Sequence, residues 1–132
     1  MDYQRDEHRV HLNVYHLVWT PKRRKPILVG EIASDCNTLI HEKCDEKGWK
    51  ILELAIQPDH SQLFVQAFPE NSPSEIIKEC KGVTSYYLRK KHSSILIKLP
   101  SIWTRSYFVA TAGNVSAETI IKYNEAQKAL WP

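Results

Sequence analysis

The chain has 132 residues, of which 42% are hydrophobic and 25% are charged. These proportions are typical of a compact globular domain, and the length favours one domain over residues 1–132, with room for a core but not for a second domain. The 18 Lys and Arg residues exceed the 15 Asp and Glu residues and give a net charge of +3. This weak excess permits a nucleic-acid partner without requiring one.

Three cysteines, Cys36, Cys44 and Cys80, form neither a CxxC pair nor an even-numbered set. This pattern disfavours a disulfide framework and a zinc ribbon, and the spacing of the thiols suits helix packing. The N-terminal segment is polar and no long apolar run occurs, so we expect neither a secretory signal nor a membrane span. These features favour a cytoplasmic protein.

The first part of the chain predicts a strand, a basic loop and a helix. Apolar residues alternate over residues 10–19, which is the period of a strand. Consecutive cations then occupy a loop over residues 21–26. Apolar residues recur at helical spacing over residues 31–47, and Gly48 favours a left-handed helix end.

The middle of the chain predicts a hairpin and a second long helix. Two alternating stretches, residues 49–57 and 60–68, flank the turn Pro58-Asp59 and form the expected antiparallel hairpin. Ser72-Pro73-Ser74-Glu75 then matches a capping box with proline at the first helical position, so we expect a helix to start there.

The end of the chain predicts a strand over residues 106–111 and, beyond Gly113, a last helix over about residues 115–130. The order is therefore βαββαβ plus a terminal helix. Right-handed crossovers favour a ferredoxin-like α/β (α+β) fold, in which two helices cover one face of an antiparallel sheet. The core is expected over about residues 8–112, with the other sheet face available for function.

Two pairs of polar residues lie on the predicted elements at spacings that put each pair on one face. His60 and Gln62 are two apart on a strand, and Tyr123 and Gln127 are four apart on the last helix. Taken singly, each has an ordinary structural explanation, because strand histidines are often satisfied by neighbours and helical tyrosines often pack against a core. Together they would supply an imidazole, two amide oxygens and a phenol.

Five blocks in order carry a resemblance to a known family. They are Tyr15-His16-Leu17-Val18-Trp19, Pro58-Asp59-His60, Ser74-Glu75-Ile76 with Lys81-Gly82, Trp103-Thr104-Arg105-Ser106-Tyr107-Phe108, and Val115-Ser116-Ala117-Glu118-Thr119-Ile120. The last block leads into Tyr123 and Gln127. Along nearly its whole length the chain resembles the single-tyrosine, TnpA-type (IS200-like) transposases of the HUH nuclease superfamily, which belong to the smallest bacterial and archaeal insertion sequences.

The resemblance implies a metal-dependent transposase that cleaves single-stranded DNA and transfers strands. Tyr123 would be the nucleophile and would form a 5′-phosphotyrosine intermediate. His60 would be the first histidine of a His-hydrophobe-His metal motif, and Gln127 a third metal ligand. This chain departs from the motif, because Ser61 and Gln62 stand where the family has a hydrophobe and a second histidine.

The departure bears on the choice of metal. A glutamine oxygen is a hard ligand, which suits Mg²⁺ or Mn²⁺ and disfavours zinc. Asp59 is an auxiliary ligand, a partner of a ligand, or simply a turn residue, and the turn role is the ordinary one.

Clustered cations predict the DNA contacts, and the resemblance implies recognition of DNA hairpins near the ends of the element. The predicted DNA-binding residues are Lys22, Arg23, Arg24, Lys25, Lys78, Lys81, Arg89 and Arg105. The resemblance also implies a homodimer whose active sites are shared between the chains. Two alternatives stay open: a catalytically weak hairpin-DNA-binding protein derived from such a transposase, and an RNA-binding sheet of similar topology.

Overall fold

The computed structural model describes residues 12–96, 99 and 101–111. The predicted last helix, with Tyr123 and Gln127, lies outside the described residues, as does the beginning of the predicted first strand. The elements in chain order are β1 (Asn13–Trp19), the short 3₁₀ helix η2 (Lys22–Arg24), α1 (Gly30–Lys47), β2 (Lys50–Gln57), β3 (His60–Ala67), α2 (Pro73–Lys91), α3 (Ser93–Leu96) and β4 (Phe108–Thr111).

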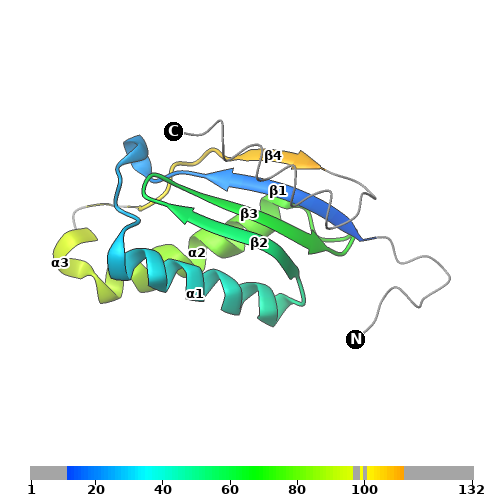
Figure 1. Cartoon of the computed structure of the whole chain (residues 1–132), viewed down its shortest axis with the longest axis horizontal. Coiled ribbons are helices and arrows are strands. Elements are labelled where there is room, and N and C mark those ends of the chain that lie inside the picture. Colours follow the sequence, from blue (N-terminus) through cyan, green and yellow to red (C-terminus); the bar gives the residue numbers. More distant parts are fainter. Residues whose placement is uncertain (1–11, 97–98, 100, 112–132) are drawn as a thin grey trace.

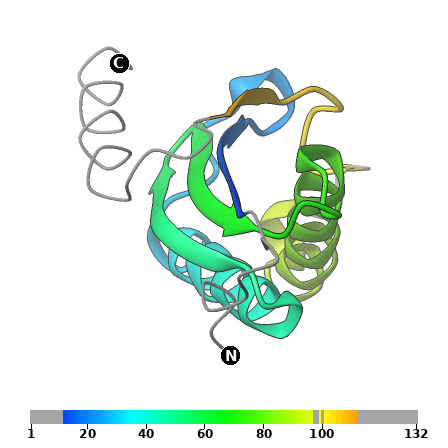
Figure 2. The ribbon, with the colours of Figure 1, turned by 90° about the vertical axis from the view of Figure 1, so that its right-hand side faces the viewer.

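The four strands form one antiparallel sheet in the order β2-β3-β1-β4. α1 and α2 pack side by side beneath one face of this sheet (Figures 1 and 2). This βαββαβ arrangement with both long helices on one face confirms the predicted ferredoxin-like fold. Among the described helices, none is long and apolar enough to cross a membrane.

The ends of the two long helices follow local sequence signals. α1 ends at Gly48, whose φ of 77° is left-handed and whose N–H bonds the carbonyls of Asp45 and Cys44. At the start of α2, the Ser72 hydroxyl accepts a hydrogen bond from the Glu75 N–H at 3.2 Å. The Glu75 carboxylate accepts its bond from Asn71 Nδ2 at 3.3 Å, so among the described contacts only the Ser72 half of the predicted capping box forms.

The core lies between the sheet and the helices. Alternate β1 residues Tyr15, Leu17 and Trp19 point into it, together with Leu63 and Val65 of β3. The cysteines Cys36, Cys44 and Cys80 are free thiols with 0–1% exposure and belong to the same cluster. They therefore act as small apolar residues in the helix interface, as their spacing predicted.

The segment between α2 and β4 is anchored more firmly than its sequence indicated. The Trp103 indole donates to Thr84 Oγ1 at 2.9 Å, and the Thr84 hydroxyl donates to the Cys80 carbonyl at 2.7 Å. Lys81 Nζ donates to the carbonyls of Thr104 and Ser106 at 2.7 and 3.1 Å. These contacts tie residues 103–106 to α2, and the last strand begins only at Phe108, two residues later than predicted.

Candidate functional site

The sheet face turned away from α1 and α2 carries a group of buried polar residues. Because side chains alternate along a strand, His16 of β1 and His60 and Gln62 of β3 lie on this face together with Phe64. The three polar residues are only 1–2% exposed. Polar groups at this depth must be paired or have a function that requires them there.

The predicted pair His60 and Gln62 makes direct contact. His60 Nε2 lies 3.1 Å from Gln62 Nε2, and His60 Nδ1 lies 2.8 Å from Asp59 Oδ1. The carboxamide oxygen Oε1 of Gln62 is buried and makes no hydrogen bond within the described residues.

This donor set suits a divalent cation. The amide oxygen of Gln62 is a hard ligand that suits Mg²⁺ and Mn²⁺, and the neutral imidazole of His60, on the same strand face, is a common metal ligand in proteins. His60 and Gln62 therefore fit the metal that the chain's sequence led us to expect, while Gln127 lies outside the described residues.

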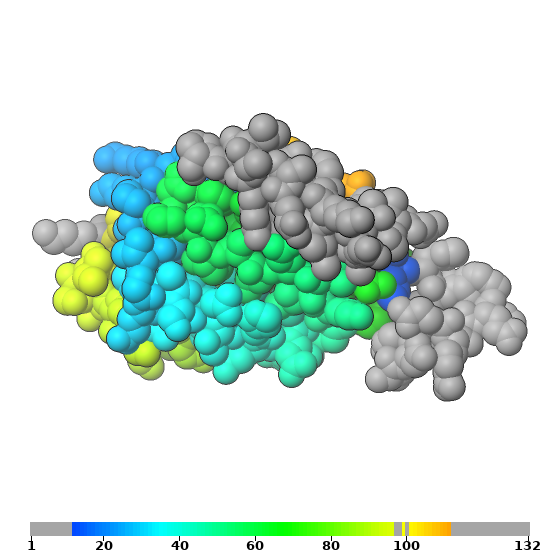
Figure 3. Space-filling view, viewed as in Figure 1, coloured from blue at the N-terminus to red at the C-terminus, as the bar shows by residue number. Residues whose placement is uncertain are grey.

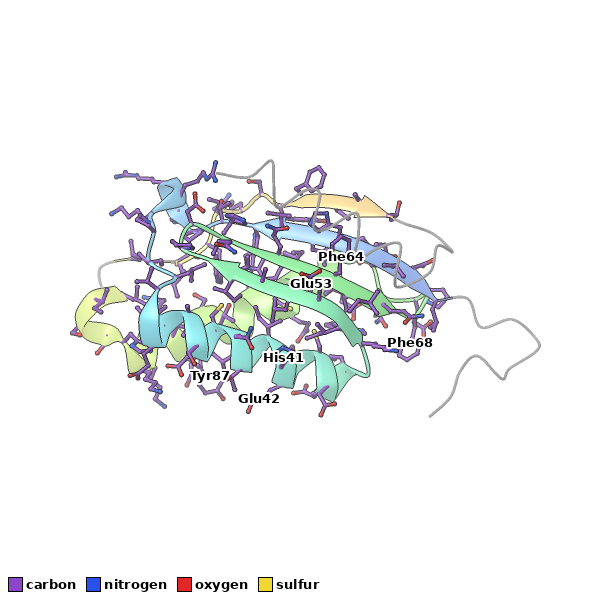
Figure 4. All side chains as sticks on the ribbon, in the orientation of Figure 1. His41, Glu42, Glu53, Phe64, Phe68 and Tyr87 are labelled. Atoms are coloured by element: carbon purple, nitrogen blue, oxygen red, sulfur yellow. The ribbon has the colours of Figure 1, made fainter. Side chains whose placement is uncertain are left out.

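His16 adjoins this pair, and the sequence did not single it out as a site residue. Its ring stacks on Phe64 with centroids 4.3 Å apart, and the edge of Phe108 lies 6.1 Å away. Burial lowers the pKa of His16, which the Gln62 side chain and the charge of Glu53 partly offset. Figure 4 places Glu53 and Phe64 together on the sheet, where their backbones are in register. Strand alternation was the available signal, but it does not give the register that brings β1 beside Gln62.

The basic loop adjoins the same end of β3. Arg24 Nη2 lies 2.8 Å from Asp59 Oδ2, and Asp59 in turn contacts His60. The hydrogen bond with His60, followed by the charge of Arg24, lowers the pKa of Asp59. Figure 3 shows the loop, in blue, protruding from the end of the molecule that also carries α3, in yellow. Lys22 to Lys25 thus lie near the turn that leads into His60.

The other predicted DNA-binding residues lie on or beside α2, in the helical layer. Lys78 and Arg105 are exposed, and Arg89 is half-buried. Lys81 is also half-buried, and this burial lowers its pKa. The predicted cations therefore form a loop group and an α2 group, and Arg105 lies on a segment whose backbone bonds both the loop and Lys81. Whether either group binds DNA stays a prediction.

The α2 group is accompanied by exposed aromatic side chains. Tyr86 and Tyr87 are 60% and 50% exposed, their rings meet edge to face at 4.9 Å, and Lys90 Nζ lies 5.8 Å from the Tyr86 ring centre. Figure 4 shows Tyr87 in the helical layer, below the sheet. Aromatic faces beside cations are suited to stacking with bases and binding phosphates.

A second cluster of metal-ligating groups lies at the end of the helical layer. Ligand atoms of Glu31, Asp35 and His92 all lie within 4.8 Å of one another, which makes a metal ion possible there. Lys91 Nζ, however, lies 3.0 Å from Asp35 and 3.3 Å from Glu31, and His92 Nε2 lies 2.8 Å from Asp35. The carboxylates already have cationic partners. We therefore interpret this cluster as an ion-pair network between α1 and the end of α2.

Comparison with known proteins gives the family. Residues 9–127 match the family model described as "Transposase IS200 like". The chain belongs to this family. IS200-like relatives include the ISDra2 transposase TnpA of Deinococcus radiodurans, 28% identical over 115 residues that cover 86% of this chain and 82% of the relative. The transposase of insertion sequence IS200 from Salmonella typhimurium is 28% identical over 106 residues, covering 79% of this chain and 70% of the relative.

Solved structures agree with the IS200-like assignment. A crystal structure of a candidate transposase from D. radiodurans superposes with a TM-score of 0.74 at 25% identity, covering 96% of this chain and 98% of that one. A REP-associated tyrosine transposase bound to a REP hairpin superposes with a TM-score of 0.62 at 14% identity, covering 93% and 68%, and this likeness shows the fold. The relatives support a DNA-processing transposase.

Proposed function

We propose that this IS200-like transposase cleaves and rejoins single-stranded DNA, with Tyr123 as nucleophile and with a divalent cation held by His60, Gln62 and Gln127. The observation that supports it most directly is the buried His60–Gln62 pair, in which the amide oxygen of Gln62 makes no hydrogen bond within the described residues. Family membership supplies the DNA-processing reaction class.

The chemistry proceeds by in-line displacement at phosphorus. Tyr123 Oη forms a bond to the phosphorus while the bond to the 3′ oxygen breaks, giving a 5′-phosphotyrosine and a free 3′-hydroxyl that takes up a proton. An ordinary tyrosine has a pKa of about 10, so the phenol must lose its proton as it attacks. The cation would supply Lewis-acid polarisation of the phosphate. The covalent link conserves the phosphodiester energy for rejoining.

DNA recognition would use the basic loop and the α2 group. A protein of the same fold is bound to a REP hairpin in its structure, which supports a hairpin substrate for this chain. The loop lies near His60 through the Arg24–Asp59 contact, where the strand to be cleaved would enter. The exposed Tyr86 and Tyr87 with Lys78 and Lys90 offer a second surface, suited to stacking and phosphate contact.

The active unit would be a homodimer. β4 lies at the edge of the sheet and pairs only with β1 among the described strands, and its residues Phe108 and Val109 are 52% and 39% exposed. An exposed, apolar edge strand is a natural place for a second chain to pair. The same proposal includes a shared active site. One chain contributes His60 and Gln62, and its partner contributes Tyr123 and Gln127.

The test uses a single-stranded suicide oligonucleotide carrying the element's flanking DNA, incubated with Mn²⁺, and measures covalent protein–DNA adduct on a denaturing gel. Wild type is expected to form the adduct. Tyr123→Phe should still shift hairpin DNA but form none, because it lacks the nucleophilic oxygen. Tyr107→Phe is the matched control, because Tyr107 packs against the core and near Lys81, and it should retain adduct formation.

Two results would decide against the proposal. An adduct on Tyr123→Phe would assign the nucleophile to another residue. Hairpin binding by wild type with no adduct under any divalent metal would instead support a binding protein that has lost cleavage, the alternative that Gln62 in the metal motif favours.

A further inference from the structure

Two side chains, those of Arg24 and Asp59, connect the solvent to the buried imidazole of His60. Arg24 Nη2 contacts Asp59 Oδ2 at 2.8 Å, and Asp59 Oδ1 contacts His60 Nδ1 at 2.8 Å. The exposed fractions of the side chains fall along this series, from 52% for Arg24 and 29% for Asp59 to 1% for His60. One carboxylate therefore binds an exposed cation with one oxygen and a buried ring with the other.

The backbone around Arg24 is held in an unusual conformation. Arg23 and Arg24 have φ values of 59° and 51°, which side-chain-bearing residues rarely adopt. The Lys22 N–H bonds the Ile102 carbonyl at 2.8 Å, and the Leu28 N–H bonds the Pro58 carbonyl at 3.0 Å. The second bond ties the loop to the turn that carries Asp59. Left-handed residues that the surrounding structure maintains in this way often mark functional positions.

The contact with Asp59 determines which nitrogen of His60 carries the proton. An ionised carboxylate can only accept hydrogen bonds, so Nδ1 must be the donor. A neutral imidazole has a single N–H, so Nε2 then presents its lone pair on the side of Gln62. A histidine that binds a metal through Nε2 needs this tautomer, and a carboxylate on its other nitrogen is one of the usual partners that impose it.

We propose that Asp59 and Arg24 are positioning residues that set the tautomer and the ring orientation of His60. Asp59 accepts a hydrogen bond from the Nδ1–H group, and Arg24 keeps the partly exposed carboxylate from rotating into solvent. The inference rests on the proposed metal-binding role of His60, and it gives Arg24 a function distinct from that of its neighbour Arg23. The partners are 35 residues apart in the chain, so no local motif predicts the contact.

The experiment reads the tautomer directly in the full chain, without DNA. Long-range ¹H–¹⁵N spectra separate protonated from unprotonated ring nitrogens, and a His60→Ala sample identifies the His60 signals among the six histidines. The same samples are then titrated with Mn²⁺ while free Mn²⁺ is followed by electron paramagnetic resonance. The variants are Asp59→Ala and Arg24→Ala. Arg23→Ala is the matched control, since it also removes a left-handed arginine.

The expected result is the Nδ1–H form in wild type and in Arg23→Ala. Asp59→Ala should shift His60 toward the Nε2–H form and weaken Mn²⁺ binding by roughly 10- to 100-fold, the usual effect of losing a ligand's partner. Arg24→Ala, which leaves the turn intact, should change both quantities in the same direction and by less.

Retention of the Nδ1–H form in Asp59→Ala would overturn the proposal, whatever the Mn²⁺ affinity. An effect of Arg23→Ala equal to that of Arg24→Ala would overturn the part assigned to Arg24. If wild type binds no Mn²⁺ while Asp59→Ala still changes the tautomer, the positioning role stands and the metal-dependent function fails.

Discussion

Gln62 occupies the position at which this chain departs from the His-hydrophobe-His pattern, and its surroundings explain why an amide is tolerated there. The side chain is buried between His60 and His16, and its nitrogen lies 3.1 Å from His60 Nε2. The amide oxygen makes no hydrogen bond within the described part of the chain. An amide in this setting can offer a hard oxygen to a cation.

Substitutions at Gln62 test this interpretation. Losing the hydrogen-bond partner of a metal ligand typically weakens metal binding by roughly 10- to 100-fold. Gln62→Ala removes a proposed ligand itself, so it should weaken Mn²⁺ binding by at least as much and should reduce adduct formation in parallel. Gln62→His should retain cleavage and shift the preference toward softer ions, because imidazole suits zinc better than an amide does. Calorimetric titration with Mg²⁺, Mn²⁺ and Zn²⁺ measures both. Equal Mn²⁺ affinity in wild type and Gln62→Ala would remove Gln62 from the metal site.

The two long helices are held together at one end by charge. Asp35 of α1 contacts His92 at 2.8 Å and Lys91 at 3.0 Å. The hydrogen bond from His92, then that from Lys91, lowers the pKa of Asp35 below its ordinary value of 3.8. A carboxylate with a depressed folded-state pKa stabilises the fold above its ordinary pKa, and this stabilisation is lost as the pH falls through the folded-state value.

Asp35→Asn should therefore lower the urea midpoint at pH 6, and the difference from wild type should shrink as the pH falls below about 3.8. Urea unfolding at pH 6 and pH 3 measures this. Asp45→Asn is the control, on the same helix and with no ion pair in the described residues, and it should leave the midpoint unchanged. A constant difference at both pH values would show that Asp35 acts through packing.

The anchoring of residues 103–106 to α2 makes a second prediction at the level of elements. Thr84→Val removes the hydroxyl that accepts from the buried Trp103 indole at 2.9 Å. The indole N–H is then left unsatisfied, so the free energy of unfolding should fall by about 1–3 kcal/mol. Denaturant unfolding followed by tryptophan fluorescence gives the value. No loss of stability would mean that the indole finds another acceptor.

At the scale of the whole molecule, one small domain offers little surface for gripping a hairpin and a cleavage site together. The proposal of shared active sites is tested by mixing inactive His60→Ala chains with inactive Tyr123→Phe chains and confirming the mixed dimers by mass. In a shared arrangement, each mixed dimer has one site with both defects and one with neither, so adduct formation should return to roughly half of the wild-type level per dimer, a statistical consequence of closed two-fold symmetry.

Verified mixed dimers that stay inactive would place His60 and Tyr123 of each site in the same chain. The nuclease assignment would survive that result, because each chain would still hold a complete set of residues. Wild-type homodimers mixed by the same protocol serve as the control for losses during exchange.

Several features of the molecule were predictable because their causes are local. The period of two in β1 and β3 put His60 and Gln62 on one face, since neighbouring strand residues always alternate. Gly48 ended α1 because a left-handed residue closes a helix with little strain. The βαββαβ order followed from such signals, and right-handed crossovers left few topologies to choose from.

Other features depended on contacts between residues far apart in the chain. Only the register of β1 against β3 brings His16 beside Gln62, and only the fold of the loop brings Arg24 to Asp59. The contacts of Lys81 were equally unpredictable from the sequence. Its place on a basic helix suggests an exposed cation, whereas in the structure its ammonium donates to the carbonyls of Thr104 and Ser106. The sequence by itself determined the elements, the fold class and the family, because periodicity, caps and family motifs are written in neighbouring residues. The tertiary structure alone decided which polar groups share a site, because burial and strand register depend on the packing of the entire chain.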